Sequence, residues 1–316
     1  MWRYALRRLS FLPLLMIGVS IITFFLLRVL PQQDPAILMA GQNATPEQIA
    51  AIHKELGLDK PIVVQFFDWV SDVARGDLGT TYYGKRDILD EVVRRFPASA
   101  ELILLSLAIS VVTGVSFGVI SAAMRNSPFD YVVRLLAVLG QSVPEFFLLI
   151  LLIMLPSILW AYAPPSGGYV SPFEDLWRNI RMFGPPSLVL GIGGSAGIMR
   201  LQRTTMLEVL RSDYVRTARA KGLGGYNVVM THAFRNTLAP LVTVVGASFA
   251  AVFAGSVIAE RIMSLDGLGV FFLNSVILRD FPVVQFLVLY TATVIILANL
   301  VVDLSYAYID PRVRYR

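Results

Sequence analysis

About six apolar segments, each long enough to cross a bilayer, constrain this chain more than any other feature of its sequence. A spanning helix needs ~20 mostly apolar residues, because the hydrocarbon core of a bilayer is ~30 Å thick. Charged residues make up only 16% of the 316 positions, too few for a soluble chain of this length. The expected spans are residues 9–30, 102–124, 132–160, 185–210, 237–259 and 281–302. The fourth is free of charge only as far as Met199 and is expected to continue as an amphipathic helix to about Leu210. The predicted fold class is an all-α integral membrane protein.

The first apolar segment follows a basic N-terminus and is predicted to stay as a transmembrane helix. Arg3, Arg7 and Arg8 precede the uncharged run Leu9–Leu27. A cleaved signal peptide has a shorter apolar core of ~7–15 residues and a cleavage site of small residues. The length of the run here favours an uncleaved first span.

The distribution of Lys and Arg predicts the orientation of the spans. With the N-terminus inside, the inner segments are residues 1–8, 125–134, 200–235 and 303–316, and they carry 15 basic and 5 acidic residues. The rest of the chain carries 12 basic and 17 acidic residues. Basic short loops stay on the cytoplasmic side. Both termini are therefore predicted to be cytoplasmic, and topology explains the net charge of +5 without nucleic acid.

The long outer segment after the first span is predicted to have structure of its own. Thr45 and Pro46 are typical of a helix start and Gly57 of a helix end, and residues 75–79 form a turn. A second helix over residues 63–74 places four apolar side chains on one side: Val63, Phe66, Phe67 and Val70. The predicted organisation is an N-terminal transmembrane helix (1–30), an extracytoplasmic region (31–101), a core transmembrane domain (102–306) containing a cytoplasmic region (200–235), and a cytoplasmic tail (307–316).

The basic loop between the fourth and fifth spans contains the signal for a short helix. Ser212 or Asp213 can cap its start, and Gly222 can end it. A helix this short is marginal in water, so a docking partner is a natural source of its stability. Tyr214, Ala218 and Gly222 fall four residues apart and are expected on one face. Three cations point elsewhere: Arg216, Arg219 and Lys221. The alternative is a basic loop set only by the positive-inside rule.

The residues of this loop resemble the inner-loop signature of ABC importer permeases, in particular those of the dipeptide, oligopeptide and nickel branch. The match covers residues 214–223 and 232–236, followed by Pro240. The general importer pattern is Glu-Ala-Ala, then three residues, then Gly. Its first three positions are occupied here, ahead of Gly222, by Arg216, Thr217 and Ala218. The Glu is absent, as is common in this branch.

Further matches to this branch follow in the same order along the chain. They are Arg7-Arg8-Leu9, Gly76-Asp77-Leu78-Gly79, residues 206–210, Glu260 with Gly267-Leu268-Gly269, residues 279–285, and Ile309-Asp310-Pro311-Arg312. The resemblance implies the type I ABC importer permease fold and a multi-pass subunit of the inner membrane. It also implies four kinds of partner: a second, homologous permease chain, two ATP-binding subunits, an extracytoplasmic solute-binding protein, and membrane lipid.

In that family the short inner helix docks into a groove on an ATP-binding subunit. The resemblance carries this coupling role to six positions: Tyr214, Arg216, Ala218, Arg219, Lys221 and Gly222. The chain has no Gly-rich phosphate loop, so it cannot supply the ATP chemistry itself. ATP and Mg are expected in the partner subunits, and no cofactor is expected in this chain.

An ionisable residue inside the third span is the first candidate for the solute pathway. Glu145 follows Pro144, and a charge at that depth marks a cavity or pathway by default. A protonated, paired or snorkelling Glu is the alternative. Gln141 and Ser142 are weaker candidates. Pro144 and Pro240 are expected to kink their helices.

The glycines of the fourth span are interpreted as close-packing positions rather than as a gate. These small residues are Gly191, Gly193, Gly194, Ser195 and Gly197. No metal site is expected, because the chain has no Cys and its two histidines, His53 and His232, lie on opposite sides of the predicted membrane.

The predicted function is therefore a non-enzymatic permease subunit of an ATP-driven, binding-protein-dependent importer that forms half of the translocation pathway. Peptides are the commonest cargo of the branch it resembles, and nickel chelates and oligosaccharides are the alternatives. A secondary transporter would favour inverted repeats and several buried charges. A membrane enzyme would need paired acids, or a nucleophile with a base, inside the spans. The sequence favours neither.

Overall fold

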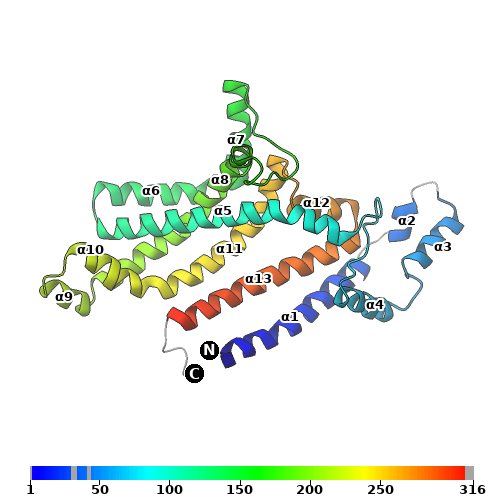
Figure 1. Ribbon diagram of the computed structural model, residues 1–316, viewed down its shortest axis with the longest axis horizontal. Coiled ribbons are helices and arrows are strands. Elements are labelled where there is room, and N and C mark those ends of the chain that lie inside the picture. The colour runs from blue at the N-terminus through cyan, green and yellow to red at the C-terminus, as the bar shows by residue number, and fades with distance from the viewer. Residues whose placement is uncertain (1, 30–33, 41–43, 310–316) are drawn as a thin grey trace. The chain divides into compact units, whose positions relative to one another are not determined.

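The protein is helical, apart from turns and two isolated β-bridges, across the part of the chain that its computed structural model describes, residues 2–29, 34–40 and 44–309 (Figure 1). The helices are α1 (Trp2–Val29), α2 (Pro35–Ala40), α3 (Pro46–Glu55), α4 (Ile62–Ala74), α5 (Ile88–Ala123), α6 (Pro128–Ser142), α7 (Glu145–Trp160), α8 (Leu176–Leu210), α9 (Asp213–Ala220), α10 (Gly225–Asn227), the π-helix η1 (Val228–Phe234), α11 (Arg235–Met263), α12 (Leu268–Leu278) and α13 (Phe281–Ile309). The predicted span end at Leu30 and the motif Asp310-Pro311-Arg312 lie outside the described residues.

The long apolar helices confirm the all-α membrane fold. Four helical runs are long and apolar enough to cross a membrane: α5, α8, the run from α10 to α11, and α13. The pair α6–α7 makes a fifth if its two bent helices count as one span. α1 lies where the first span was expected, with the apolar stretch Leu12–Arg28.

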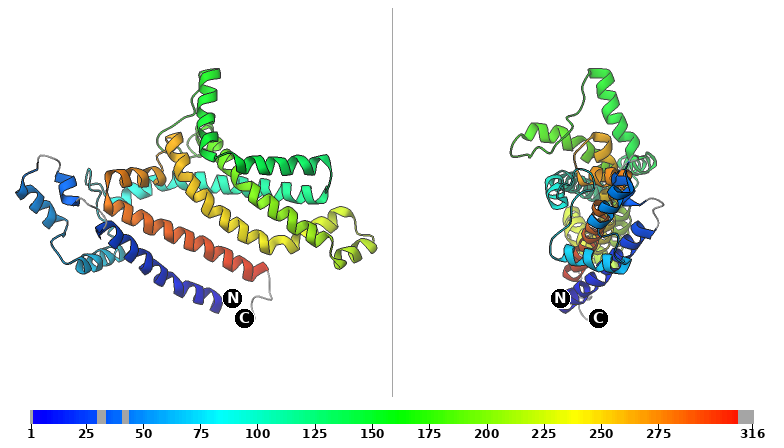
Figure 2. Two further views of the ribbon diagram at one scale, coloured as in Figure 1. Left: turned by 180° about the vertical axis from the view of Figure 1, so that it is seen from behind. Right: turned by 90° about the vertical axis from the view of Figure 1, so that its right-hand side faces the viewer.

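The third predicted span is broken, which corrects the single helix expected over residues 132–160. α6 ends at Ser142, α7 begins at Glu145, and their axes differ by 91° (Figures 1 and 2). Val143 takes the extended conformation, φ −93° and ψ 122°, because a residue before proline avoids the α region. Pro144 therefore breaks the span where only a kink was expected, whereas Pro240 lies inside the continuous α11.

Polar caps, rather than the ends of the apolar runs, set where α5 and α8 begin. The spans predicted to begin at Leu102 and Pro185 lie in helices that start earlier, at Ile88 and Leu176. The Asp87 carboxylate accepts the backbone N–H groups of Leu89 at 2.7 Å and Asp90 at 3.2 Å, at the start of α5. Asp175 caps α8 by accepting the Arg178 N–H at 2.9 Å. Each helix thus extends beyond the segment that hydropathy identifies.

The chain divides into two compact units. Of the described residues, the N-terminal unit contains those within 2–96 and 271–297, and the core unit contains 97–270 and 298–309. The core unit is built around α8, which packs against α6, α7 and α11. Its largest buried cluster includes Leu102, Leu149 and Phe183.

Glycines let α8 and α5 approach closely. For Gly191 and Gly194, this confirms the prediction that the small residues of α8 are close-packing positions. A Cβ added at Gly191 would lie 2.6 Å from the Ile109 side chain, and one at Gly194 would lie 2.5 Å from Ser110 Oγ. The Ser110 hydroxyl donates to the Gly191 carbonyl at 2.7 Å, which joins the two helices. Such contacts leave no room for a larger side chain.

The N-terminal unit confirms the expected helix signals of the outer segment. Thr45 Oγ1 accepts the Gln48 N–H at 3.3 Å, and Gln48 Oε1 accepts the Thr45 N–H at 3.0 Å, which completes a capping box. Gly57 follows α3 with φ +62°, a conformation that favours glycine. On α4, Phe66 packs on Phe24 of α1 at 5.3 Å between ring centroids, while Val63 and Phe67 stay exposed. The apolar face expected on α4 is therefore only partly covered by packing against other residues.

Candidate functional site

The short inner helix forms as α9, between Ser212 and Lys221. Gly222 ends it with φ +80°, as expected of a glycine stop signal. Ser212 holds the N-cap position, but its hydroxyl donates to the Val209 carbonyl at 2.5 Å instead of capping the helix. α9 packs against α8 and η1, which supply the tertiary contacts that so short a helix needs.

The buried side of α9 differs from the predicted one. Val215 and Ala218, three residues apart, are 0% and 7% exposed and pack against the chain itself. Ala218 is therefore not on an exposed docking face, which corrects the four-residue spacing proposed from the sequence. Tyr214 is 46% exposed, and its hydroxyl donates to the His232 carbonyl at 3.4 Å. The remaining predicted coupling residues are exposed: Arg216, Arg219, Lys221 and Gly222.

Three exposed apolar side chains beyond α9 were missed by sequence reasoning. Tyr226 is 77% exposed, Leu223 39% and Met230 36%. Their signal in the sequence is weak, because apolar residues near a glycine-rich turn are usually assigned to the core. Eight of the exposed residues of this loop are called the coupling surface: Tyr214, Arg216, Arg219, Lys221, Gly222, Leu223, Tyr226 and Met230. An aromatic and basic composition is typical of protein interfaces, where Tyr and Arg are enriched.

A buried ion pair joins the ends of α5, α6 and α8. Arg203 on α8 donates from Nε to Asp130 Oδ1 at 2.7 Å and from Nη2 to Oδ2 at 2.8 Å. Asp130 is 0% exposed and also accepts the Ser121 hydroxyl at 2.5 Å and the Asn126 N–H at 3.0 Å. Both oxygens of the carboxylate are therefore satisfied, as a buried charge requires. The sequence shows only two loop charges, 73 residues apart.

Glu145 lies at the break between α6 and α7, facing two glycines on other helices. A Cβ added at Gly193 of α8 would lie 2.5 Å from Glu145 Oε1, and one at Gly255 of α11 would lie 3.0 Å from Oε2. The side chain is half-buried and has no hydrogen bond or ion pair to a described residue. The glycines therefore leave room for a carboxylate between α7, α8 and α11.

The other two pathway candidates occupy the last turn of α6. Gln141 is exposed, and its Nε2 would lie 3.9 Å from a Cβ added at Gly197 of α8. The structure thus brings both candidates to glycines of α8: Gln141 lies beside Gly197, and Glu145 lies beside Gly193. The Ser142 hydroxyl instead donates to the Val138 carbonyl of its own helix at 2.8 Å.

Glu260, one of the residues in the sequence motifs, serves as a helix cap. Its carboxylate is 0% exposed and accepts the N–H groups of Gly269 at 2.8 Å and Val270 at 3.1 Å at the start of α12. Ser99 donates to Glu260 at 2.5 Å and accepts the Leu268 N–H at 2.8 Å. A Cβ at Gly267 would collide with the carboxylate, which explains the glycine there. This group is fully paired and structural.

The described residues contain no group of three or more His, Asp or Glu side chains that could hold a metal ion. His53 pairs with Asp34 in the N-terminal unit, and the His232 carbonyl accepts the Tyr214 hydroxyl in the core unit. The two histidines thus have separate roles. The core unit thus offers an exposed aromatic and basic surface beyond α8, and a break between α6 and α7 where Glu145 faces glycines of α8 and α11.

Comparison with known proteins gives two family matches that together cover most of the chain. Residues 114–315 match the family described as binding-protein-dependent transport system inner membrane component. Residues 1–108 match the N-terminal family of membrane components of the same transport systems.

Individual relatives match the chain over nearly its full length. A protein of Brucella abortus (strain 2308) is 41% identical over 304 residues, 96% of each chain. The dipeptide transport system permease protein DppB of Escherichia coli (strain K12) is 38% identical over 339 aligned positions, and DppB of Alkalihalophilus pseudofirmus is 36% identical over 334; each alignment covers 100% of both chains.

A solved structure has a similar fold. It is titled "Inward facing conformations of the MetNI methionine ABC transporter: CY5 native crystal form". The superposition has a TM-score of 0.54 and 15% sequence identity, and it covers 70% of this chain and 97% of the other. At this identity the likeness concerns the fold alone.

Proposed function

Because the chain belongs to the family of binding-protein-dependent transport system inner membrane components, we propose that it forms part of the pathway through which an ABC importer takes up di- or oligopeptides. Family membership makes it a multi-pass permease subunit of the inner membrane. Such a subunit works with ATP-binding subunits and a solute-binding protein, and it is not itself catalytic. The cargo is the part of the proposal that goes beyond the family.

The observation that carries the peptide cargo is the full-length similarity to two dipeptide permeases at 36% and 38% identity. The decisive experiment reconstitutes the complete transporter with its binding protein and measures ATP-dependent uptake of a labelled dipeptide. Uptake should be competed by unlabelled di- and tripeptides and not by nickel chelates or oligosaccharides. If nickel chelates or oligosaccharides competed with the labelled dipeptide and unlabelled peptides did not, the cargo would belong to the competing class instead.

The coupling surface is proposed to receive an ATP-binding subunit. Its support is the exposed aromatic and basic composition of α9 and the following turn, in a loop whose backbone is fixed by packing against α8 and η1. Tyr214, Arg216, Arg219, Lys221 and Gly222 keep the contact role, while Ala218 holds α9 against its own chain. Energy from ATP would enter the permease here, because α9 is attached to the end of α8.

A second, related permease chain is proposed to complete the pathway. α7 is apolar from Phe146 to Trp160 apart from Ser157, and it remains largely exposed, with Ile158 71% and Trp160 72% exposed. An apolar helix of this kind needs lipid or another apolar helix as its neighbour. One chain would then provide half of the pathway.

Cytoplasmic termini are proposed from the Lys and Arg distribution, and the absence of cysteine makes this testable. In a Thr217→Cys variant, the exposed thiol on α9 should react with a membrane-impermeant thiol reagent only from the cytoplasmic side. In a Gln48→Cys variant, with the thiol on α3, labelling should come only from the outside. Labelling of both from one side would reverse or refute this topology.

Glu145 and Gln141 are proposed to line the solute pathway, with Ser142 the weaker candidate. The Glu145→Gln variant keeps the size of the side chain and removes its charge. We expect dipeptide uptake to fall about 10-fold, since one charged hydrogen bond contributes ~1.5–3 kcal/mol. Ser142→Ala tests the weaker candidate and should change uptake by no more than about twofold, because its hydroxyl already donates to the Val138 carbonyl within α6. Wild-type uptake by Glu145→Gln would remove Glu145 from the pathway.

A further inference from the structure

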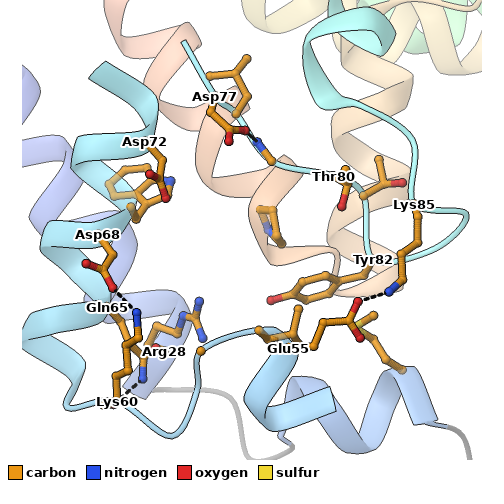
Figure 3. A pocket seen from close by; sticks show the side chains of 18 residues that line it. Arg28, Glu55, Lys60, Gln65, Asp68, Asp72, Asp77, Thr80, Tyr82 and Lys85 are labelled. Atoms are coloured by element: carbon orange, nitrogen blue, oxygen red, sulfur yellow. Dashed lines mark hydrogen bonds and ion pairs between the residues drawn. The ribbon is translucent and has the colours of Figure 1, made fainter. Parts of the chain in front are cut away.

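A polar pocket in the N-terminal unit is not used by any role described so far. Its volume is about 430 Å³, within the ~300–1,000 Å³ range of small-molecule sites (Figure 3). The wall is formed by the end of α1, α3, α4 and the loop from Asp77 to Lys85, with Pro282 at one side. All of these segments belong to the same compact unit.

Two unpaired nitrogens of the Arg28 guanidinium, at the end of α1, are the main feature of this pocket. Arg28 Nε and Nη1 are buried, and neither has a hydrogen-bond partner among the described residues. The Phe24 ring lies beside the guanidinium, with its centroid 5.5 Å from Arg28 Cζ. Leaving charged donors buried without an acceptor is costly, so the site is built for an acceptor that is not supplied by these residues.

Gln65 adds an unpaired acceptor to the same pocket. Its Nε2 donates to the Lys60 carbonyl at 2.8 Å and the Leu58 carbonyl at 3.3 Å, which fixes the orientation of the amide. The opposite atom, Oε1, is buried and has no partner among the described residues. Gln65 can therefore accept an N–H group from a molecule in the pocket.

The other cations of the pocket are already paired, which leaves Arg28 as the charge that can bind an anion. Lys60 pairs with Asp68 at 2.6 Å, and Lys85 pairs with Glu55. The carboxylate of Asp72 forms no ion pair with a described residue and lines the side opposite Tyr82 (Figure 3). Burial raises the pKa of Tyr82 to about 12, so its hydroxyl stays protonated and can donate.

We propose that this pocket binds a short zwitterionic peptide in its free form. The C-terminal carboxylate is held by the Arg28 guanidinium through Nε or Nη1, a backbone N–H is accepted by Gln65 Oε1, and the N-terminal ammonium lies toward Asp72. A planar guanidinium suits a carboxylate because it can offer two parallel N–H donors. The inference rests on the proposed peptide cargo and adds a cargo-recognition site on the permease itself.

The test measures binding of alanyl-alanine and of its C-terminal amide to the assembled transporter in nanodiscs, without the binding protein. The wild type should bind the free dipeptide about 10-fold more tightly than the amide, since the amide lacks the charge that Arg28 holds. In Arg28→Gln this preference should disappear. Arg28→Lys keeps the charge but not the planar guanidinium, and it should retain part of the preference.

Arg75→Gln is the matched control, because Arg75 is an exposed arginine of the same unit that does not line the pocket. It should keep the full preference for the free carboxylate. Equal binding of dipeptide and amide by the wild type, or an unchanged preference in Arg28→Gln and Arg28→Lys, would overturn the proposal. Weaker docking of the binding protein to Arg28→Gln, with unchanged dipeptide binding, would assign the anion to that protein instead. Any of these results combined with intact dipeptide uptake would leave the proposed function standing.

Discussion

Replacing Arg203 with Ala should lower the free energy of unfolding by about 3–5 kcal/mol, because it leaves the Asp130 carboxylate buried without its counter-charge. Asp130 is 0% exposed, and Arg203 supplies two of its four short hydrogen bonds. The loss should appear as a lower midpoint of thermal or denaturant unfolding of the purified chain in detergent. The ends of α5, α6 and α8 should open first.

Arg134→Ala is the matched control, because Arg134 also approaches Asp130, at 3.6 Å, but is 42% exposed. Its loss should cost under ~1 kcal/mol, as for solvent-screened pairs. Adding Asp130→Asn to Arg203→Ala should recover part of the stability, since no buried charge remains. Equal effects of Arg134→Ala and Arg203→Ala would show that the buried geometry of this pair does not matter.

Removing both tyrosines of the coupling surface should weaken the contact with the ATP-binding subunits and, with it, peptide uptake. In the variant Tyr214→Ala with Tyr226→Ala, we expect the permease to bind its ATP-binding subunits at least 30-fold more weakly, because aromatic residues at interface centres contribute ~2 kcal/mol or more each. Peptide uptake should fall in parallel. The measurements are the affinity for the purified ATP-binding subunit and the uptake rate in proteoliposomes.

Phe173→Ala is the control for this variant, since Phe173 is 98% exposed and lies in the connection between α7 and α8, away from α9 in the sequence. Its removal takes away a comparable exposed aromatic surface and should leave the affinity for the ATP-binding subunit unchanged. If the double tyrosine variant kept wild-type affinity, the contact would have to lie on another part of the inner loops.

The features that the sequence predicts correctly depend on local chemistry. Apolar run length identified the segments that form α5, α8, α11 and α13, and the caps at Thr45 and Gly222 were recognisable because each acts within a few residues. The packing of α9 was misjudged because two spacings compete on so short a helix. The helical period allows Ala218 to share a face with either Tyr214, four residues earlier, or Val215, three residues earlier. Only the position of η1 decides which of these two faces is buried.

The parts that were missed depend on contacts between distant segments. Nothing near Asp130 indicates that Arg203 will satisfy it, and nothing near Arg28 indicates that Gln65 will face the same cavity. Pro144 was identified as a kink, but the size of the bend depends on Val143 taking an extended conformation. Local rules identify such positions, while tertiary packing determines what they do.

The right-angle break after α6 determines what surrounds this part of the chain. α6 has 15 residues and α7 has 16, so each is shorter than the ~20 residues that cross a hydrocarbon core. Backbone carbonyls freed at a break cannot be satisfied by lipid tails, and they need protein or water as partners. Acyl chains alone therefore cannot solvate the bend beside Glu145, and the membrane must be locally hydrated or sealed by polypeptide at this point.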